Sequence, residues 1–258
     1  MPNRSPMGLR KYQNWNGSRW MYTREQSQWH FDPNEFTNDY QPICQFIGDW
    51  EFSVEKCMKR VQDCTWATRN HFSKEPDENR KPMYSATAEE MDLFKVGANP
   101  KQEIFQRAYA EDIDIFQTIA SHFKMTDVDV KFHNQRPGQT LNLHIDNFAG
   151  RKERGNSFKE IKADKNPDAM RRFVVMLDDW KYGQVFMLGN QVWHNWRRGD
   201  CITWDWRDIP HCTSNMGWDN RPMLQVTGWT TSETHELVKS GSFNNVVNIA
   251  DNDKQNGY

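Results

Sequence analysis

The sequence predicts a mainly β protein with flanking helices, built as an antiparallel sandwich or barrel. Two observations predict it. From residue 126 to about residue 230, apolar and polar residues alternate with a period of two, as in half-buried strands. Turn signals rich in Gly, Pro, Asn and Asp divide this region into seven short stretches, a spacing typical of all-β sandwiches and barrels.

The first part of the chain contains fewer regular patterns. The first forty residues are rich in Asn, Arg, Trp and Tyr, and we expect them to wrap around the domain. Residues 44–66 fit strands or a short helix equally well, and the Pro and charge content of residues 71–83 predicts a polar loop. Residues 110–125 predict a helix, because apolar side chains recur there at helical spacing and acidic residues occupy the first turn.

The seven alternating stretches follow in order, and each is a predicted strand. They are "DVDVKFH", "QTLNLHID", "RRFVVMLDDW", "GQVFMLGNQVW", "RRGDCITWDW" with a turn at Gly199-Asp200, "HCTSNMG" and "RPMLQVTGWT". A last helix is predicted in "TSETHELVKSG", with Ser232 as N-cap and Gly241 just past its end. We therefore expect one domain over 1–258, in which 1–125 is an N-terminal elaboration, 126–230 the core, and 231–258 a C-terminal helix and tail.

Net charge, apolar runs and cysteine spacing argue against several classes of protein. The formal net charge is −2, so there is no overall electrostatic attraction to nucleic acid or an anionic membrane, and neither is an expected partner. No apolar run reaches membrane-spanning length, and the N-terminus lacks the apolar middle of a signal peptide. Five cysteines without CxxC spacing argue against a disulfide framework or structural zinc. We expect a cytoplasmic protein, in the host cytoplasm if the chain is phage-encoded.

The stretch "QTLNLHID" carries candidate metal ligands. On a regular strand Thr140, Asn142, His144 and Asp146 would share one face, and Leu141, Leu143 and Ile145 the other. An imidazole and a carboxylate in a cavity would need one more histidine to hold iron in a 2-His-1-carboxylate site. The His-x-Asp spacing alone has little specificity, because it recurs at His30 and Asp32, where Pro33 indicates a helix start instead.

His211 is the best candidate for the third ligand. It opens a predicted strand, and Arg221 follows ten residues later at the start of the next. By alternation Arg221 shares a face with Met223, Gln225 and Thr227, where its guanidinium could bind a carboxylate through two charge-assisted hydrogen bonds. The other downstream histidines have no arginine at this offset: His194 has Trp204 and His235 has Asn245.

This ordered pattern resembles the Fe(II)/2-oxoglutarate-dependent dioxygenases. Their fold is the double-stranded β-helix, a cupin-like jelly-roll, and the resemblance covers about the C-terminal half of the chain. It implies that His144, Asp146 and His211 bind Fe(II) and form the catalytic iron centre, and that Arg221 binds the distal carboxylate of 2-oxoglutarate. It also implies dioxygen as a substrate and ascorbate as a possible reductant.

The sequence is somewhat similar to the aspartyl/asparaginyl and prolyl hydroxylases in that superfamily, and to phage-type oxygenases. In the aspartyl hydroxylase group an arginine on the strand after the first ligand strand helps to hold the cofactor, which Arg171 or Arg172 would match here, although about twenty residues intervene. Asn142, Gln225 and Thr227 are further candidates for cofactor contact. The implied reaction is hydroxylation of a C–H bond of a protein side chain or an amino-acid-like molecule, with release of succinate and CO₂. A carboxylate at Asp146 favours hydroxylation over halogenation.

Other interpretations remain open. His144 and Asp146 could be an ordinary polar strand face, His211 a core histidine, and Arg221 the ion-pair partner of Asp205 or Asp219. The whole chain could be a non-catalytic jelly-roll binding protein, or a metal-dependent cupin-type enzyme without 2-oxoglutarate. Residues 149–172 carry eight basic and four acidic residues, which fits a solvated loop or a lid over an anionic substrate.

Overall fold

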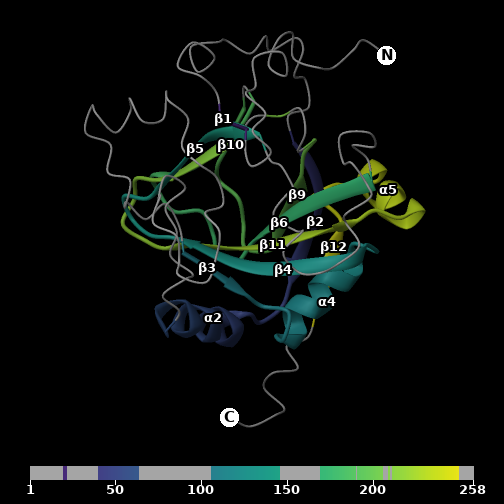
Figure 1. The fold of residues 1–258 in the computed structure, drawn as a ribbon, viewed down its shortest axis with the longest axis horizontal. Helices are drawn as coiled ribbons and strands as arrows, with labels where there is room; N and C mark the ends of the chain where they lie inside the picture. The colour runs from purple at the N-terminus through teal and green to yellow at the C-terminus, as the bar shows by residue number, and fades with distance from the viewer. Residues whose placement is uncertain are drawn as a thin grey trace.

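The computed structural model consists of two packed β-sheets with helices on the outer face of the larger sheet (Figure 1). The structure describes residues 20–21, 40–63, 106–145, 169–189, 191–205, 209 and 211–249; for 20–21, 62–63 and 142–145 it describes the backbone only. The sequence-predicted polar loop 71–83, the pair His30 and Asp32, and most of the stretch 149–172 lie outside these ranges.

The smaller sheet has five strands in the order β1-β5-β10-β7-β8. Their bounds are Trp20–Met21 (β1), Thr140–Ile145 (β5), His211–Asn215 (β10), Gln184–Leu188 (β7) and Gln191–Trp193 (β8). The larger sheet has seven strands in the order β12-β2-β9-β6-β11-β4-β3. Their bounds are Val246–Asn248 (β12), Gln41–Ile47 (β2), Asp200–Thr203 (β9), Met170–Met176 (β6), Arg221–Trp229 (β11), Thr126–Gln135 (β4) and Gln106–Tyr109 (β3).

The strand order is that of a double-stranded β-helix. Strands β4 to β11 follow one another along the chain and pass repeatedly between the sheets, so that β9-β6-β11-β4 lie side by side in one layer and β5-β10-β7-β8 in the other. Every pairing among these eight strands is antiparallel. This confirms the cupin-like jelly-roll expected from the sequence. One detail differs: "GQVFMLGNQVW" forms a hairpin of two strands, β7 and β8, because Gly189 turns the chain at a positive φ of 58°.

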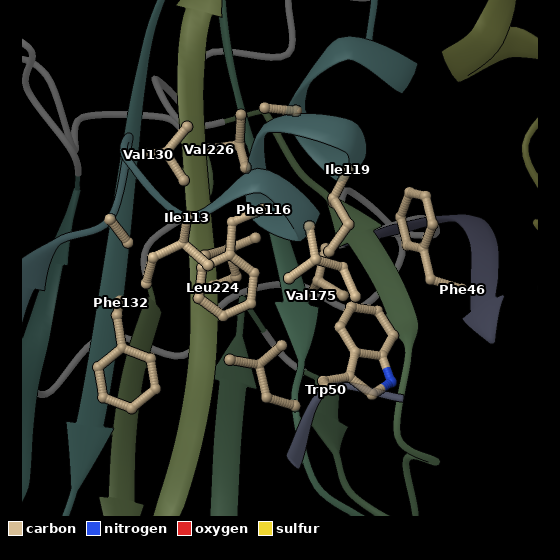
Figure 2. Packing of buried hydrophobic residues seen from close by; sticks show 14 of the residues in the cluster. Phe46, Trp50, Ile113, Phe116, Ile119, Val130, Phe132, Val175, Leu224 and Val226 are labelled. Carbon is tan, nitrogen blue, oxygen red and sulfur yellow. The ribbon is translucent and has the colours of Figure 1, made fainter. Parts of the chain in front are cut away.

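Helices and an apolar core cover the outer face of the larger sheet. Helix α2 (Glu51–Asp63) and helix α4 (Asp114–His122) lie on the side away from β5 and β10 (Figure 1). Phe116 and Ile119 of α4 pack onto Leu224 and Val226 of β11 in this outer core (Figure 2). Of the undecided stretch 44–66, the described part up to residue 63 is a strand followed by a helix. The helix expected over 110–125 is present and shorter.

The N-cap of the C-terminal helix lies one residue earlier than predicted. Helix α5 (Ser232–Lys239) is capped by Thr231, whose hydroxyl accepts from the Thr234 N–H at 3.2 Å while the Thr234 hydroxyl accepts from the Thr231 N–H at 3.1 Å. This reciprocal capping box satisfies two N–H groups, which a cap at Ser232 would not do. The prediction of Ser232 as N-cap was wrong.

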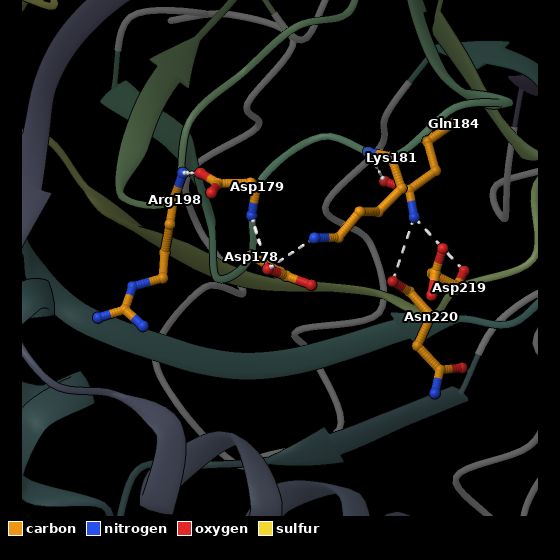
Figure 3. Close-up of polar contacts among 7 residues, drawn as sticks. All are labelled: Asp178, Asp179, Lys181, Gln184, Arg198, Asp219 and Asn220. Atoms are coloured by element: carbon orange, nitrogen blue, oxygen red, sulfur yellow. Dashed lines mark hydrogen bonds and ion pairs between the residues drawn. The ribbon is translucent and has the colours of Figure 1, made fainter.

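A polar network fixes the loops at the end of the sandwich where β11 begins. The Gln184 amide donates to the backbone carbonyls of Asp219 and Asn220 at 3.4 and 3.1 Å, and its own carbonyl accepts from the Lys181 N–H (Figure 3). Asp179 accepts from the Arg198 N–H at 2.8 Å. Because Asn220 directly precedes Arg221, these bonds hold the start of β11 in place.

Among the described residues, no helix is both long and apolar enough to cross a membrane. The four described cysteines, Cys44, Cys57, Cys201 and Cys212, are free thiols.

Candidate functional site

The inner face of the larger sheet, which looks toward the smaller sheet, is divided into an apolar half and a polar half. Val174, Met176 and Ile202 of β6 and β9 pack with Phe186 and Leu188 of β7 in an inner apolar core. On β4 and β11 the same face is polar instead. Its buried members there are Asp129, His133, Gln135, Arg221 and Thr227. Polar side chains inside a barrel need partners or a ligand, so this half is the candidate site.

Arg221 is the most unusual residue of the polar half. Its side chain is only 3% exposed, and its Nη2 donates to Gln135 Oε1 at 2.8 Å. The guanidinium carbon lies 5.8 Å from the centre of the Phe186 ring and 6.0 Å from that of Trp196. Nε and Nη1 are buried without a hydrogen-bond partner. Within the described residues no carboxylate contacts Arg221, so the predicted alternative of an ion pair with Asp205 or Asp219 does not occur.

Burial changes the energetics of that guanidinium. Loss of water lowers the pKa of Arg221 to about 9, which leaves it charged at pH 7. A buried charge with a neutral amide as its hydrogen-bonding partner is expensive, and each unsatisfied buried donor costs roughly 1–3 kcal/mol. The buried guanidinium of Arg221 is therefore suited to an anion that accepts from Nε and Nη1.

His211 also points into the sandwich. It is 4% exposed and lies edge-on to Trp204, with ring centres 4.8 Å apart. Its Nδ1 lies 3.3 Å from the carbonyl oxygen of Ile209. A carbonyl only accepts, so this contact favours the tautomer with hydrogen on Nδ1 and the lone pair on Nε2, the atom a metal would need. Burial of this degree is common to metal ligands and to core histidines.

The strand register places His211 next to the other predicted ligand strand. In the antiparallel pair of β10 and β5, His211 is the direct partner of His144. Opposed residues of neighbouring strands have Cα atoms about 4.5–5.5 Å apart. The side chain of His144, that of Asn142, and all of Asp146 lie outside what the structure describes, so the predicted iron triad stays a prediction. No other group of three His, Cys, Asp or Glu side chains in the described ranges could hold a metal.

The pairing of β5 with β10 is irregular, and this corrects the expectation for Thr140. Thr213 is two positions from His211 on β10, but their partners Leu141 and His144 are three positions apart on β5. This irregularity changes which face Thr140 occupies. Its hydroxyl lies 2.9 Å from that of Ser214 on the exposed outer side, whereas Thr213 points inward and accepts from the Gln135 amide at 3.2 Å. Thr140 therefore lies on the outer side of its sheet, and the prediction that it faces the interior was wrong.

The other predicted cofactor residues lie further along the inner face. Arg172 and Thr227 are register partners, and Arg172 Nε donates to the Thr227 hydroxyl at 3.2 Å. Gln225 is half-buried between them and Arg221 on β11. Arg171 is on the opposite face of β6 by alternation, so Arg172 is the one of the two that belongs to the inner face.

The inner-face residues that were missed from the sequence include the charged or titratable side chains of Arg107, Lys131 and His133. Lys131 and His133 stand on β4, where they alternate with the outer-core residues Val130 and Phe132, and Arg107 is the register partner of His133 on β3. The alternation of "DVDVKFH" could have identified Lys131 and His133. Arg107 could not be found, because no pattern indicated the strand β3.

His133 is buried among cations. Burial first, then the charges of Arg107, Lys131, Arg172 and Arg221, hold its pKa well below the usual histidine value. It is therefore neutral at pH 7. The positive charges of these four side chains therefore all act on the His133 imidazole.

Comparisons with known proteins add little to this geometry. No family model matches the chain, and no curated protein matches it. Among solved structures, a predicted oxalate decarboxylase from Thermotoga maritima is 15% identical and covers 49% of this chain and 81% of its own, with a TM-score of 0.30. The cupin domain of Cnp3 from Schizosaccharomyces pombe is 10% identical and covers 56% and 77%, with a TM-score of 0.30.

A sugar phosphate isomerase of the cupin superfamily from Silicibacter pomeroyi is 13% identical and covers 49% of this chain and 60% of its own, also with a TM-score of 0.30. Similarities at this level carry no argument about activity or ligands. The fold assignment rests on the strand order of the chain itself, and the functional argument on its inner face.

Proposed function

We propose that the chain is an Fe(II)- and 2-oxoglutarate-dependent oxygenase that hydroxylates a C–H bond of a protein side chain or a small amino-acid-like molecule. The observation that carries the proposal is the buried guanidinium of Arg221, which has two unpartnered nitrogens and lies one strand connection after His211. A carboxylate that accepts from these nitrogens would satisfy both and neutralise the charge.

The described residues fit the two cofactors in chemical type. Arg221 would bind a carboxylate of 2-oxoglutarate, with Gln135 holding the guanidinium in place through Nη2. His211, with its ring oriented by the Ile209 carbonyl, would be an iron ligand together with His144 and Asp146. When bound, iron and 2-oxoglutarate would supply the oxidising power for hydroxylation, with dioxygen consumed and succinate and CO₂ released.

The surrounding side chains would position the cofactors and exclude water. Trp204 and Phe186 border His211, and Phe186 and Trp196 border Arg221. These aromatic rings lower the local dielectric, which strengthens a pairing between Arg221 and a carboxylate. They also keep bulk water from the side where a reactive centre would form.

An anaerobic titration tests the proposal. Fe(II) and then 2-oxoglutarate are added to the full chain, with the weak visible charge-transfer band and calorimetric affinity as readouts. We expect Arg221→Gln to weaken 2-oxoglutarate binding by roughly 10- to 100-fold, because charge-assisted hydrogen bonds contribute about 1.5–3 kcal/mol each. We expect His211→Ala to lose iron binding. Arg136→Gln, on the exposed turn between β4 and β5, is the control and should match the wild type.

Three results would contradict the proposal. Full 2-oxoglutarate affinity in Arg221→Gln would remove its main support. Tight metal binding without any effect of 2-oxoglutarate would favour a cupin-type enzyme that does not use this cofactor, and binding of neither would favour a non-catalytic jelly-roll. Circular dichroism of each variant separates loss of binding from loss of fold.

A further inference from the structure

Two cysteines face each other on the outer side of the larger sheet, away from the candidate site. Cys44 on β2 and Cys201 on β9 are direct register partners in an antiparallel strand pair, and both belong to the outer apolar core. Opposed residues of such a pair have Cα atoms about 4.5–5.5 Å apart, and a disulfide spans Cα separations of about 4.4–6.8 Å. The backbone therefore already places the two thiols at a separation that a disulfide bond can bridge.

The two thiols differ in their protonation. A hydrogen bond from Cys201 lowers the pKa of Cys44 to about 6; burial opposes this shift, and a hydrogen bond and the charge of His122 strengthen it. Burial raises the pKa of Cys201 well above the usual cysteine value, and the neighbouring Cys44 raises it further. At pH 7 the pair therefore consists of a Cys44 thiolate, which is the nucleophilic form, and a Cys201 thiol that donates to it.

His122 is the third member of this cluster. It lies in the last turn of helix α4, and its ring stands edge-on to Phe46, with ring centres 5.2 Å apart. Cys44 is 1% exposed and Cys201 is fully buried, but His122 is only half-buried. Hydrogen peroxide is little larger than water, so a local opening at this helix end would admit it to Cys44. Cys201 needs no contact with solvent, because it has to react only with Cys44.

We propose that Cys44 and Cys201 form an oxidative modification site, at which hydrogen peroxide converts the two thiols into a disulfide between β2 and β9. The site stands on the facing positions of the two cysteines and on the contact of Cys44 with His122, and it does not depend on the proposed oxygenase function. Because the two strands are far apart in the sequence, the bond closes a long loop and stabilises the folded chain.

The reaction consumes one peroxide for each pair of thiols. Cys44 passes its proton to the His122 imidazole, and its sulfur attacks one oxygen of the peroxide, which breaks the O–O bond. The hydroxide that leaves takes the proton from His122, which gives water and a Cys44 sulfenic acid. The Cys201 sulfur then attacks the Cys44 sulfur, the S–O bond breaks, and the leaving hydroxide takes the Cys201 proton to form a second water. The two thiols have lost two electrons, and the peroxide has gained them.

Peptide mapping tests the site. The reduced full chain is treated with hydrogen peroxide, denatured in N-ethylmaleimide to block the remaining thiols, and digested without reductant for mass spectrometry. We expect a cross-linked peptide that joins Cys44 to Cys201 and is lost after dithiothreitol, together with a higher melting temperature of the oxidised protein. N-Ethylmaleimide on both cysteines, or a cross-link to Cys57, Cys64 or Cys212 in place of this pair, would overturn the proposal.

Variants separate the roles of the three side chains. Cys201→Ala should stop the reaction at a Cys44 sulfenic acid, which dimedone traps, and Cys44→Ala should give neither product. His122→Phe should slow disulfide formation at pH 7 by roughly three- to tenfold, because Cys44 loses its proton acceptor, and by less at about pH 9, where an ordinary thiol is itself largely ionised. Cys57→Ala, which removes another buried thiol of the outer core, is the control and should match the wild type. A wild-type rate in folded His122→Phe at pH 7, or an unmodified Cys44 in folded Cys201→Ala, would contradict the assigned roles.

Discussion

The buried and incompletely hydrogen-bonded guanidinium of Arg221 is expected to lower the stability of the unliganded protein. A buried ion is often replaced by an apolar side chain of similar volume without loss of stability. We predict that Arg221→Met, packed among Phe186, Trp196 and Met223, keeps or raises the melting temperature of the apoprotein. It should also lose the stabilisation by 2-oxoglutarate, which in wild type amounts to about 2.7 kcal/mol at a hundred times Kd. Thermal unfolding with and without the ligand measures both effects; a marked fall in the apoprotein's melting temperature would contradict this account of Arg221.

Lys131 should give the protein a measurable pH dependence. Its pKa is lowered to about 8 in the folded chain, against about 10.4 when unfolded, so the unfolded state binds more protons between these values. Wild-type stability should therefore rise relative to Lys131→Met as pH increases from 8 to 10.4, by up to about 3 kcal/mol, and the difference should be constant below pH 7. Urea unfolding across this range tests it. Lys239→Met, at an exposed lysine of α5, should show no such trend.

At the scale of elements, the connection into β9 depends on Gly199. Its φ is +88°, its N–H donates to the Met176 carbonyl at 2.7 Å, and an added Cβ would overlap the carbonyl oxygen of Phe46. Gly138, at φ +83°, has open space around the same position. We predict that Gly138→Ala costs about 1–2 kcal/mol, the left-handed penalty alone, and that Gly199→Ala costs at least twice as much because β2 must shift. Equal losses in denaturant unfolding would show that the contact with Phe46 is unimportant.

The face that each side chain of a strand occupies could be predicted from the sequence where one face of the strand is uniformly buried. On β11, Leu224 and Val226 enter the outer core, and the alternating Arg221, Gln225 and Thr227 were correctly assigned to the other face. On β5 the prediction failed for Thr140. The pairing with β10 contains a register shift, and nothing in "QTLNLHID" indicates where such a shift falls, because it depends on the partner strand.

At the scale of the whole molecule, the two faces of the larger sheet differ. The outer face is apolar and contributes stability, and the inner face carries the candidate site. The outer face of this sheet packs on α2 and α4 through a continuous apolar core that includes the stacked rings of Phe123 and Phe173, 4.1 Å apart. Its inner face is left half polar. Because the helices stabilise the sheet from outside, the interior of the jelly-roll can hold charged residues that would otherwise destabilise a β-sandwich.

The sequence by itself determined the jelly-roll strands, the position of His211 at the start of one strand, and Arg221 ten residues later at the start of the next. These follow from local alternation and turn residues, which act over a few positions. Only the tertiary structure decided that Arg221 is buried without an acidic partner, and that Arg107 and Arg172 join Lys131 on one face. Burial and charge clustering arise between strands distant in sequence, and the register that sets them is a property of the assembled sheets.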